Sequence, residues 1–471
     1  MPPLAPSGPA VSLSEVLAAL SHALDLTEGQ PMGHTIRSCL IGMRMAEAIG
    51  LDAQERSALY YALLLKDAGC SSNAARMAAL FGADDRSVKP RLTAVDWQNR
   101  FRLALATARI SGSGRGPVER IRRFLAIART EGVTRDLISV RCERGAGIAR
   151  RLGFPDSTAS AVRSLDEHWC GLGHPEGLVG EDIPLLARIC SIAQTVERFQ
   201  AAEGTKAALE VIRARRGSWF DPRLVDVVLS WKRDTDWWWS LRGDEANAMV
   251  MRAEPADRVA TADEARLREV ALAFADIIDA KSPFTFRHSE RVAGYAVMLA
   301  RRLGADGATI DRLYLAGLLH DIGKLGVSNA ILDKPGKLTD DERVQIEQHP
   351  RHTLSILLRV TAFGHFAWMA AVHHEKLDGS GYPWGLGAAQ LDVPSRVLAV
   401  ADIYDALRSD RPYRVGMSHE DAMALLRRDA GTRLCPAVIG VMDTPLPEPA
   451  AGVFPESGFA AAPAVTSRAM T

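Results

Sequence analysis

Apolar residues recur at helical spacing along most of the chain. From His288 onward, for example, Val292, Tyr295, Leu299 and Leu303 fall on one stripe, the period of an amphipathic helix. The same spacing predicts further helices over residues 14–26, 36–49, 57–66, 265–279, 312–320 and 397–407. Strand-like alternation of apolar and polar residues is absent or too short to be convincing. We therefore predict an all-α fold.

The two halves of the chain resemble each other. The matched positions are His34 with His288, Lys66-Asp67 with His320-Asp321, and residues 171–178 with residues 379–386. The first two pairs are both 254 positions apart and the third is 208 positions apart, so the first copy carries 46 additional residues between them. Repetition on this scale indicates a duplicated domain. We predict two tandem helical domains of one kind.

The length of 471 residues also favours two domains over one. We assign residues 13–240 to a partner or sensor domain and residues 263–444 to a second domain. Residues 241–262 are charged and lack an apolar stripe, which indicates a linker. Residues 1–12 and 445–471 are rich in proline or in proline, alanine and serine, so we expect both tails to be disordered.

Charge and cysteine content limit the partners and the compartment. The chain has 57 basic and 57 acidic residues and no net charge, which argues against a nucleic-acid or polybasic membrane partner. We expect a small-molecule substrate, with a homodimer or a signalling protein as a further partner. The six cysteines lack paired spacing, and neither a signal peptide nor an apolar run of membrane-spanning length is present. These features predict a cytoplasmic protein without membrane segments.

Candidate metal ligands are concentrated in the second half, within 115 residues. They are His288, His320, Asp321, His349, His373, His374 and Asp402. Imidazole and carboxylate groups suit iron, manganese, zinc or nickel, and the lack of a cysteine among them disfavours a thiolate zinc site. Seven ligands are too many for one ion but fit two that share Asp321. Two such ions can hold a hydroxide nucleophile and neutralise a phosphodiester.

Each of these features alone is more often structural than functional, and only their combination favours a metal site. The glycine-rich turn 379–383 is either a tight connection or one wall of that site, because glycines let backbone amides approach an anion. Lys324 is either a solvated surface residue or a point charge for a phosphate.

The first copy keeps only His34 and Asp67 of this set. The replacements are Lys66 at the position of His320, Leu165 at His373, Asp166 at His374 and Gln194 at Asp402. Because a lysine ammonium repels a divalent cation, we expect the first copy to bind no metal of this kind. It is predicted to be a degenerate partner domain.

Taken in order, the motifs of the second half resemble the HD-GYP domain, a branch of the HD metal-dependent phosphohydrolases. They are His288, residues 320–324, His349-Pro350, His373-His374-Glu375, residues 378–383 and residues 402–407. The resemblance covers about residues 263 to 440. It implies a helical domain with a binuclear or trinuclear site that cleaves cyclic di-GMP to pGpG or GMP, and it makes the first half a decayed HD-GYP copy.

The resemblance also implies roles for single residues. One ion would be held by His288, His320, Asp321 and Asp402, and the second by Asp321, His349, His373 and His374. Asp321 and Lys324 would be catalytic. The substrate would be contacted by Lys324, Gly381, Tyr382, Arg411 and Arg414. Asp405 would orient a ligand, and Phe284 replaces a glutamate of trinuclear members, so two divalent ions, iron or manganese, are expected.

Three functions remain open from the sequence. The first is a metal-dependent phosphodiesterase for cyclic di-GMP. The second is a regulatory module of low turnover that binds a nucleotide or a protein partner. The third is a phosphohydrolase for another cyclic dinucleotide, because nothing in the sequence distinguishes guanine from adenine.

Overall fold

The structure is a computed structural model of the whole chain. It describes residues 11–94, 105, 107–111, 118, 120, 122, 133–243, 245–255, 261–410 and 415–451. Within these ranges the named elements are helices except for two strands of two residues each, β1 (Val11–Ser12) and β2 (Thr261–Ala262), which pair antiparallel. The all-α prediction is confirmed. None of the helices in this part of the chain is long and apolar enough to cross a membrane.

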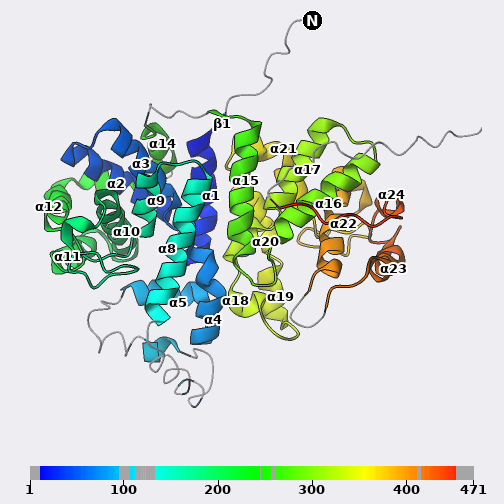
Figure 1. Cartoon of the computed structure of the whole chain (residues 1–471), viewed down its shortest axis with the longest axis horizontal. Helices are drawn as coiled ribbons and strands as arrows, with labels where there is room; N and C mark the ends of the chain where they lie inside the picture. Colours follow the sequence, from blue (N-terminus) through cyan, green and yellow to red (C-terminus); the bar gives the residue numbers. More distant parts are fainter. Residues whose placement is uncertain are drawn as a thin grey trace, which may run out of the picture.

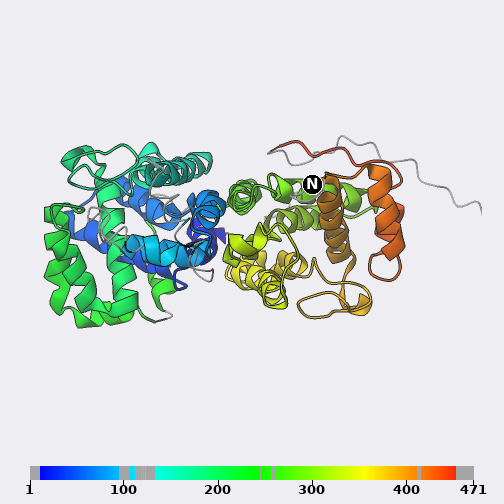
Figure 2. The same cartoon turned by 90° about the horizontal axis from the view of Figure 1, so that it is seen from below.

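The helices form two lobes that lie side by side (Figure 1). The first lobe contains α1 (Leu13–Glu28), α2 (His34–Ile49), α3 (Ala53–Leu65), α4 (Ala74–Phe81), α5 (Asp85–Ala94), α8 (Val133–Arg151), α9 (Asp156–Arg163), α10 (Leu185–Glu203), α11 (Thr205–Ala214), α12 (Pro222–Ser230), α13 (Thr235–Ser240) and α14 (Glu245–Arg252). The second contains α15 (Glu264–Asp279), α16 (His288–Arg302), α17 (Gly307–Leu319), α18 (Asn329–Leu332), α19 (Asp340–Ile346), α20 (His349–Leu357), α21 (Gly364–Ala371), α22 (Val393–Arg408), α23 (His419–Asp429) and α24 (Pro436–Gly440). Seen from below, the lobes meet along a single seam (Figure 2).

The two lobes have the same residues at the ends of matched helices: a glycine after one helix and an aspartate cap before the next. The helix α2 ends at Gly50 and α16 is followed by Gly304, with left-handed φ values of 71° and 75°. The next helix in each lobe is capped by an aspartate. Asp52 accepts the Glu55 N–H at 2.8 Å, and Asp306 accepts the Thr309 N–H at 2.7 Å, the preferred N-cap interaction. The duplication seen in the sequence is therefore present in the way the helices start and stop.

The seam is formed mainly by α1 and by the insertion of the first lobe. One cluster of buried apolar side chains continues through both lobes. Asp85, at the start of α5, is fully buried and accepts the backbone N–H of Asn329 at 2.9 Å. The neighbouring Arg86 donates to the carbonyl of Gly326. The two lobes are therefore joined by packing and by buried polar contacts.

Part of the segment predicted to be a linker folds as a helix on the first lobe. Residues 245–252 form α14, and Ala246 and Val250, one helical turn apart, are buried against the first lobe. The hydroxyl of Tyr60 also donates to the carbonyl of Val250 at 3.0 Å. Two apolar residues on one face are enough to hold a short helix on an existing core, although they are too few to form a recognisable stripe.

Both predicted disordered tails also contain ordered residues. Val11 and Ser12 pair with β2, so these two residues of the predicted N-terminal tail are ordered. At the other end Leu446 is 5% exposed, and the carbonyl of Pro449 accepts a hydrogen bond from Arg287 at 2.9 Å. Residues 1–10 and 452–471 lie outside the described residues.

Candidate metal centre

Seven side chains predicted to be metal ligands meet at one buried point in the second lobe. His288 starts α16, His320 and Asp321 follow α17, His349 starts α20, His373 and His374 follow α21, and Asp402 lies within α22. All are buried except His374, which is partly exposed. Five separate segments thus contribute imidazole or carboxylate groups to one place.

Asp321 lies at the centre of this arrangement, and its two oxygens face different partners. Oδ1 is 3.4 Å from His349 Nε2 and 3.6 Å from His373 Nε2. Oδ2 is 3.4 Å from His320 Nε2 and 3.5 Å from His288 Nε2. A carboxylate placed in this way can give one oxygen to each of two ions.

Mutual distances divide the ligands into overlapping groups. Within each group the possible ligand atoms lie within 4.8 Å of one another. The first group is Asp321 with His349, His373 and His374. The second is His288 with His320 and Asp321, and the third is His320 with His373 and Asp402. Asp402 Oδ1 is also 3.3 Å from His288 Nε2. Asp321 belongs to the first two of these groups, which suits two neighbouring cations.

Backbone carbonyls fix the orientation of three of the imidazoles. The Nδ1 atoms of His320, His349 and His373 lie 2.7, 2.6 and 2.7 Å from the carbonyl oxygens three residues earlier. Nδ1 must donate in these contacts, so Nε2 keeps its lone pair and faces the centre. His320 Nε2 and Asp321 Oδ1 are buried and have no hydrogen-bond partner among the described residues. This donor set fits divalent cations.

His288 is oriented by a carboxylate instead of a carbonyl. Its Nδ1 lies 2.7 Å from Asp405 Oδ2, and Arg291 donates from Nε to Asp405 Oδ1 at 2.6 Å. The sequence indicated Asp405 as an orienting residue but did not identify Arg291. A signal was available, because His34, Arg37 and Glu197 of the first lobe stand at the corresponding positions and make the same contacts.

The surrounding carboxylates shift the protonation of the site. Burial lowers the pKa of His288, but Asp321, Asp402 and Asp405 outweigh burial and hold it well above its ordinary value. Burial lowers the pKa of His320 to about 4. Without metal, the carboxylates therefore favour the protonated form of His288, and a cation must displace its proton to use Nε2.

Metal affinity should consequently rise with pH. One proton leaves His288 when the metal site that contains it forms, so we expect the apparent affinity of that site for Mn²⁺ to change about tenfold per pH unit below the raised pKa of His288. Affinity is lost as the pH falls, because the proton competes for Nε2. Calorimetric titration in buffers of different ionisation enthalpy measures the proton release, and a pH-independent affinity without proton release would contradict this assignment.

The glycine-rich turn is fixed beside the centre by a carboxylate. Glu375 accepts the backbone N–H groups of Trp384 and Leu386, each at 2.8 Å. A Cβ on Gly381 would lie 2.5 Å from Glu375 Cα, so only glycine allows this close approach. The turn places the Tyr382 ring 4.7 Å from the ring of His374. The role of Glu375 was not anticipated, although Glu167 binds the corresponding loop of the first lobe.

Comparison with known proteins agrees with this architecture. The HD domain family matches residues 91–224 and 273–438, which is more than half of the chain. The chain belongs to the HD-domain family, in its HD-GYP branch. The 3′3′-cGAMP-specific phosphodiesterase 3 of Vibrio cholerae serotype O1 is 43% identical over 427 residues, 90% of this chain and 92% of the relative.

A solved structure and a second curated protein differ in how much of the chain they match. A crystal structure of a cyclic GMP-AMP-specific phosphodiesterase from V. cholerae covers 92% of this chain and 97% of its own, with 38% identity and a TM-score of 0.63. A cyclic di-GMP phosphodiesterase of Pseudomonas aeruginosa is 42% identical over 143 residues, 30% of this chain and 34% of the relative. The match to both lobes shows that the duplicated arrangement occurs elsewhere.

Of the five residues predicted to contact the substrate, the structure describes Lys324, Gly381 and Tyr382. Lys324 Nζ lies 2.5 Å from Asp321 Oδ2, and its side chain is 23% exposed. It therefore borders the centre and can be reached from solvent. Gly381 packs against backbone, as shown above, while Tyr382 lies next to His374. Arg411 and Arg414 lie outside the described residues.

The corresponding place in the first lobe is filled by ion pairs. Lys66 Nζ contacts the carboxylate of Asp67 and lies 3.0 Å from His34 Nε2. Glu28, Asp67 and Cys70 also lie close enough to share a cation. However, the carboxylate of Glu28 is paired with Lys89 at 2.9 Å. These ammonium groups neutralise the carboxylates, which is the reason to expect no metal of this kind in the first copy. That expectation stays a prediction.

Proposed function

We propose that the second lobe hydrolyses a 3′3′-linked cyclic dinucleotide at a centre of two divalent ions. The observation that carries this proposal is the position of Asp321, whose two oxygens face two separate groups of imidazoles. The relative matched over nine-tenths of the chain bears the name of a 3′3′-cGAMP-specific phosphodiesterase, which supports the same class of substrate.

One ion would be held by His288, His320, Asp321 and Asp402, and the other by Asp321, His349, His373 and His374. Iron or manganese suits these ligands. When bound, the ions would supply positive charge for the phosphodiester and would activate water as the nucleophile. This reaction class needs no further cofactor.

Residues around the ions would then bind and orient the phosphate. The ammonium of Lys324 is a point charge for a non-bridging oxygen. Burial raises the pKa of Tyr382, and Asp402 and Asp321 raise it further, so its hydroxyl stays protonated and can donate a hydrogen bond. Arg411 and Arg414 would add charge to the same region. The leaving 3′-oxygen would take its proton from water or a nearby acid.

The resemblance to a family and the match over both lobes point to different nucleotides. Resemblance to the HD-GYP domain implies cyclic di-GMP, and relatives matched over part of the chain carry that name. The V. cholerae protein matched over both lobes is named for 3′3′-cGAMP. We therefore propose 3′3′-cGAMP as the better substrate, with cyclic di-GMP as the second candidate.

The test is turnover by the full chain loaded with Fe²⁺ or Mn²⁺. We expect linear dinucleotide or mononucleotides from 3′3′-cGAMP, formed faster than products of cyclic di-GMP. The double substitution His320→Ala and Asp321→Ala should abolish turnover with no loss of helical content by circular dichroism. The exposed pair His365→Ala and Asp341→Ala serves as the matched control and should retain turnover.

Each alternative outcome has a definite reading. Turnover retained by the double variant at 320 and 321 would refute the proposed centre. Tight binding of both dinucleotides by the metal-loaded protein without any product would favour the regulatory module of low turnover. Faster cleavage of cyclic di-GMP would keep the reaction and reverse the proposed specificity.

A further inference from the structure

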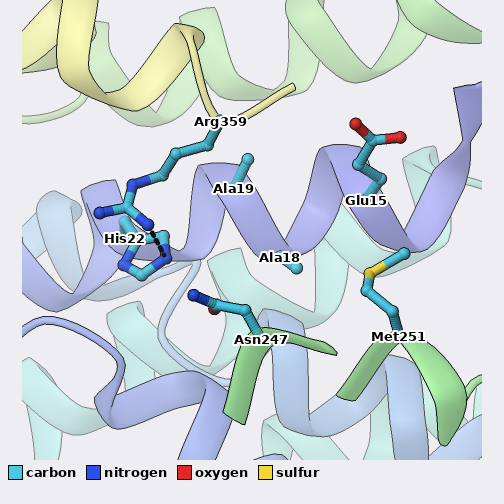
Figure 3. Close-up of a pocket in the computed structure, with 7 residues that line it drawn as sticks. All are labelled: Glu15, Ala18, Ala19, His22, Asn247, Met251 and Arg359. Carbon is cyan, nitrogen blue, oxygen red and sulfur yellow. Dashed lines mark hydrogen bonds between the residues drawn. The ribbon is translucent and has the colours of Figure 1, made fainter. Parts of the chain in front are cut away.

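A hollow lies at the seam between the lobes (Figure 3), and none of the candidate metal ligands lines it. Its volume is about 180 Å³. It is lined by Glu15, Ala18, Ala19 and His22 of α1, by Asn247 and Met251 of α14, and by Arg359, which follows α20. Residues from both lobes thus form its walls.

The hollow exists because the face of α1 that lines it carries small side chains in the middle. Glu15, Ala18, Ala19 and His22 follow the i, i+3, i+4, i+7 pattern of one helix face. The two alanines leave space that larger side chains would fill, and Met251 forms an apolar and adaptable wall beside them. The floor that α1 gives the hollow is therefore apolar, while Asn247 of α14 adds a polar amide to the opposite wall.

One end of the hollow is cationic. Arg359 donates from Nη1 to His22 Nε2 at 3.1 Å, and no carboxylate among the described residues pairs with its guanidinium. His22 is 4% exposed, and its Nδ1 has no hydrogen-bond partner within the described part of the chain. Burial and Arg359 lower the pKa of His22 to about 4, so the histidine is neutral and leaves the arginine charge uncompensated.

The other end of the hollow is anionic. Glu15 accepts the backbone N–H of Thr361 with Oε1 at 3.0 Å, and it forms no ion pair with a described residue. Seven residues separate Glu15 from His22, so the two ends are about 10 Å apart along the helix axis. The hollow therefore has opposite charges at its ends and an apolar floor between them.

We propose that this hollow binds a small extended zwitterion, with its anionic group at Arg359 and its amine at Glu15. The ligand would contact α1 and α14 of the first lobe and the segment after α20 of the second. Since α20 begins at His349, such a ligand would also bear on the helix that carries one candidate metal ligand. The effect of the ligand on the metal centre rests on the proposed function. Binding of the zwitterion in the hollow does not.

Binding is tested with the full chain and 6-aminohexanoate as the probe, by isothermal titration calorimetry. Hexanoate and hexylamine each carry only one of its charged groups and serve as comparisons. We expect the zwitterion to bind at least tenfold more tightly than either of them. It should also raise the melting temperature, because a ligand that binds only the folded chain stabilises it.

Two substitutions remove one charge each but keep the local hydrogen bonds. In Arg359→Gln the amide can still donate to His22, and in Glu15→Gln the amide oxygen can still accept from Thr361. We expect each to weaken binding of 6-aminohexanoate at least fivefold. The controls Arg427→Gln and Glu420→Gln change exposed charges of α23, at the far side of the second lobe (Figure 1), and should bind the probe normally.

Several results would overturn the proposal whatever the outcome for hydrolysis. These are the absence of binding by the full chain at millimolar probe, equal affinity for hexanoate and 6-aminohexanoate, and affinity that survives both substitutions at the hollow. Because calorimetry measures binding directly, failure of the phosphodiesterase assay would not affect this conclusion.

Discussion

Asp321→Asn should abolish metal binding in the second lobe and lower the rate of dinucleotide hydrolysis by roughly 1,000-fold or more. The amide keeps the size of the carboxylate but can no longer offer a charged oxygen to each of two ions. Charge stabilisation supplied by such ions is worth several kcal/mol in the transition state, and each 1.4 kcal/mol is about tenfold in rate. Metal analysis and turnover number measure the two effects.

Asp341→Asn is the matched control, because Asp341 is an exposed aspartate in the first turn of α19. It should leave metal content and turnover unchanged. An Asp321→Asn protein that still holds two ions and hydrolyses the substrate would contradict the role given to this carboxylate. Loss of metal in both variants would point instead to general instability.

Gly323→Ala should be the most damaging single-methyl substitution near the centre. A Cβ at this position would lie 1.9 Å from the carbonyl oxygen of His349 and 2.7 Å from the Thr353 nitrogen. These are backbone atoms of α20, so the helix itself must move. Overpacking of this kind costs about 1–3 kcal/mol of unfolding free energy, and displacement of His349 should also weaken metal binding.

Chemical denaturation and metal titration measure the two consequences. Gly307→Ala provides a control, because a Cβ there has no neighbour within 4 Å and the residue lies in the first turn of α17. That substitution should be neutral or stabilise the helix slightly. If Gly323→Ala were as stable as the Gly307→Ala protein and bound metal equally well, the close contact with α20 would be wrong.

Much of the architecture could be predicted because each helix carries its own signals. The stripe that starts at His288 corresponds to α16, and the predicted helix over residues 14–26 lies within α1. The helix α14 was missed, because its two buried residues, Ala246 and Val250, are stabilised by packing on the first lobe and form no apolar stripe of their own. Tertiary contacts of this kind leave no periodic pattern.

The candidate site shows a similar division. His320 and Asp321 could be predicted as a pair, because adjacent nitrogen and oxygen ligands stand out after an apolar helix. The contributions of Arg291 and Glu375 could not be read in the same way, since each acts through another residue or through backbone N–H groups. Comparison of the two halves would have revealed both, because Arg37 and Glu167 make the equivalent contacts.

The first lobe has other residues at most positions that correspond to the candidate metal ligands. Lys66 occupies the position of His320 and places its ammonium between His34 and Asp67. A covalently attached cation thus satisfies groups that in the second lobe face the centre. The replacement of His320 by Lys66 therefore gives the same fold an internal ion pair in the first lobe and a candidate metal centre in the second.

The most direct measurement is anomalous diffraction from crystals of the full chain grown with Mn²⁺. We expect two peaks in the second lobe, with Asp321 between them, the imidazoles of His288 and His320 at one and those of His349 and His373 at the other. Peaks at Glu28, Asp67 and Cys70 of the first lobe, or none near Asp321, would contradict this expectation.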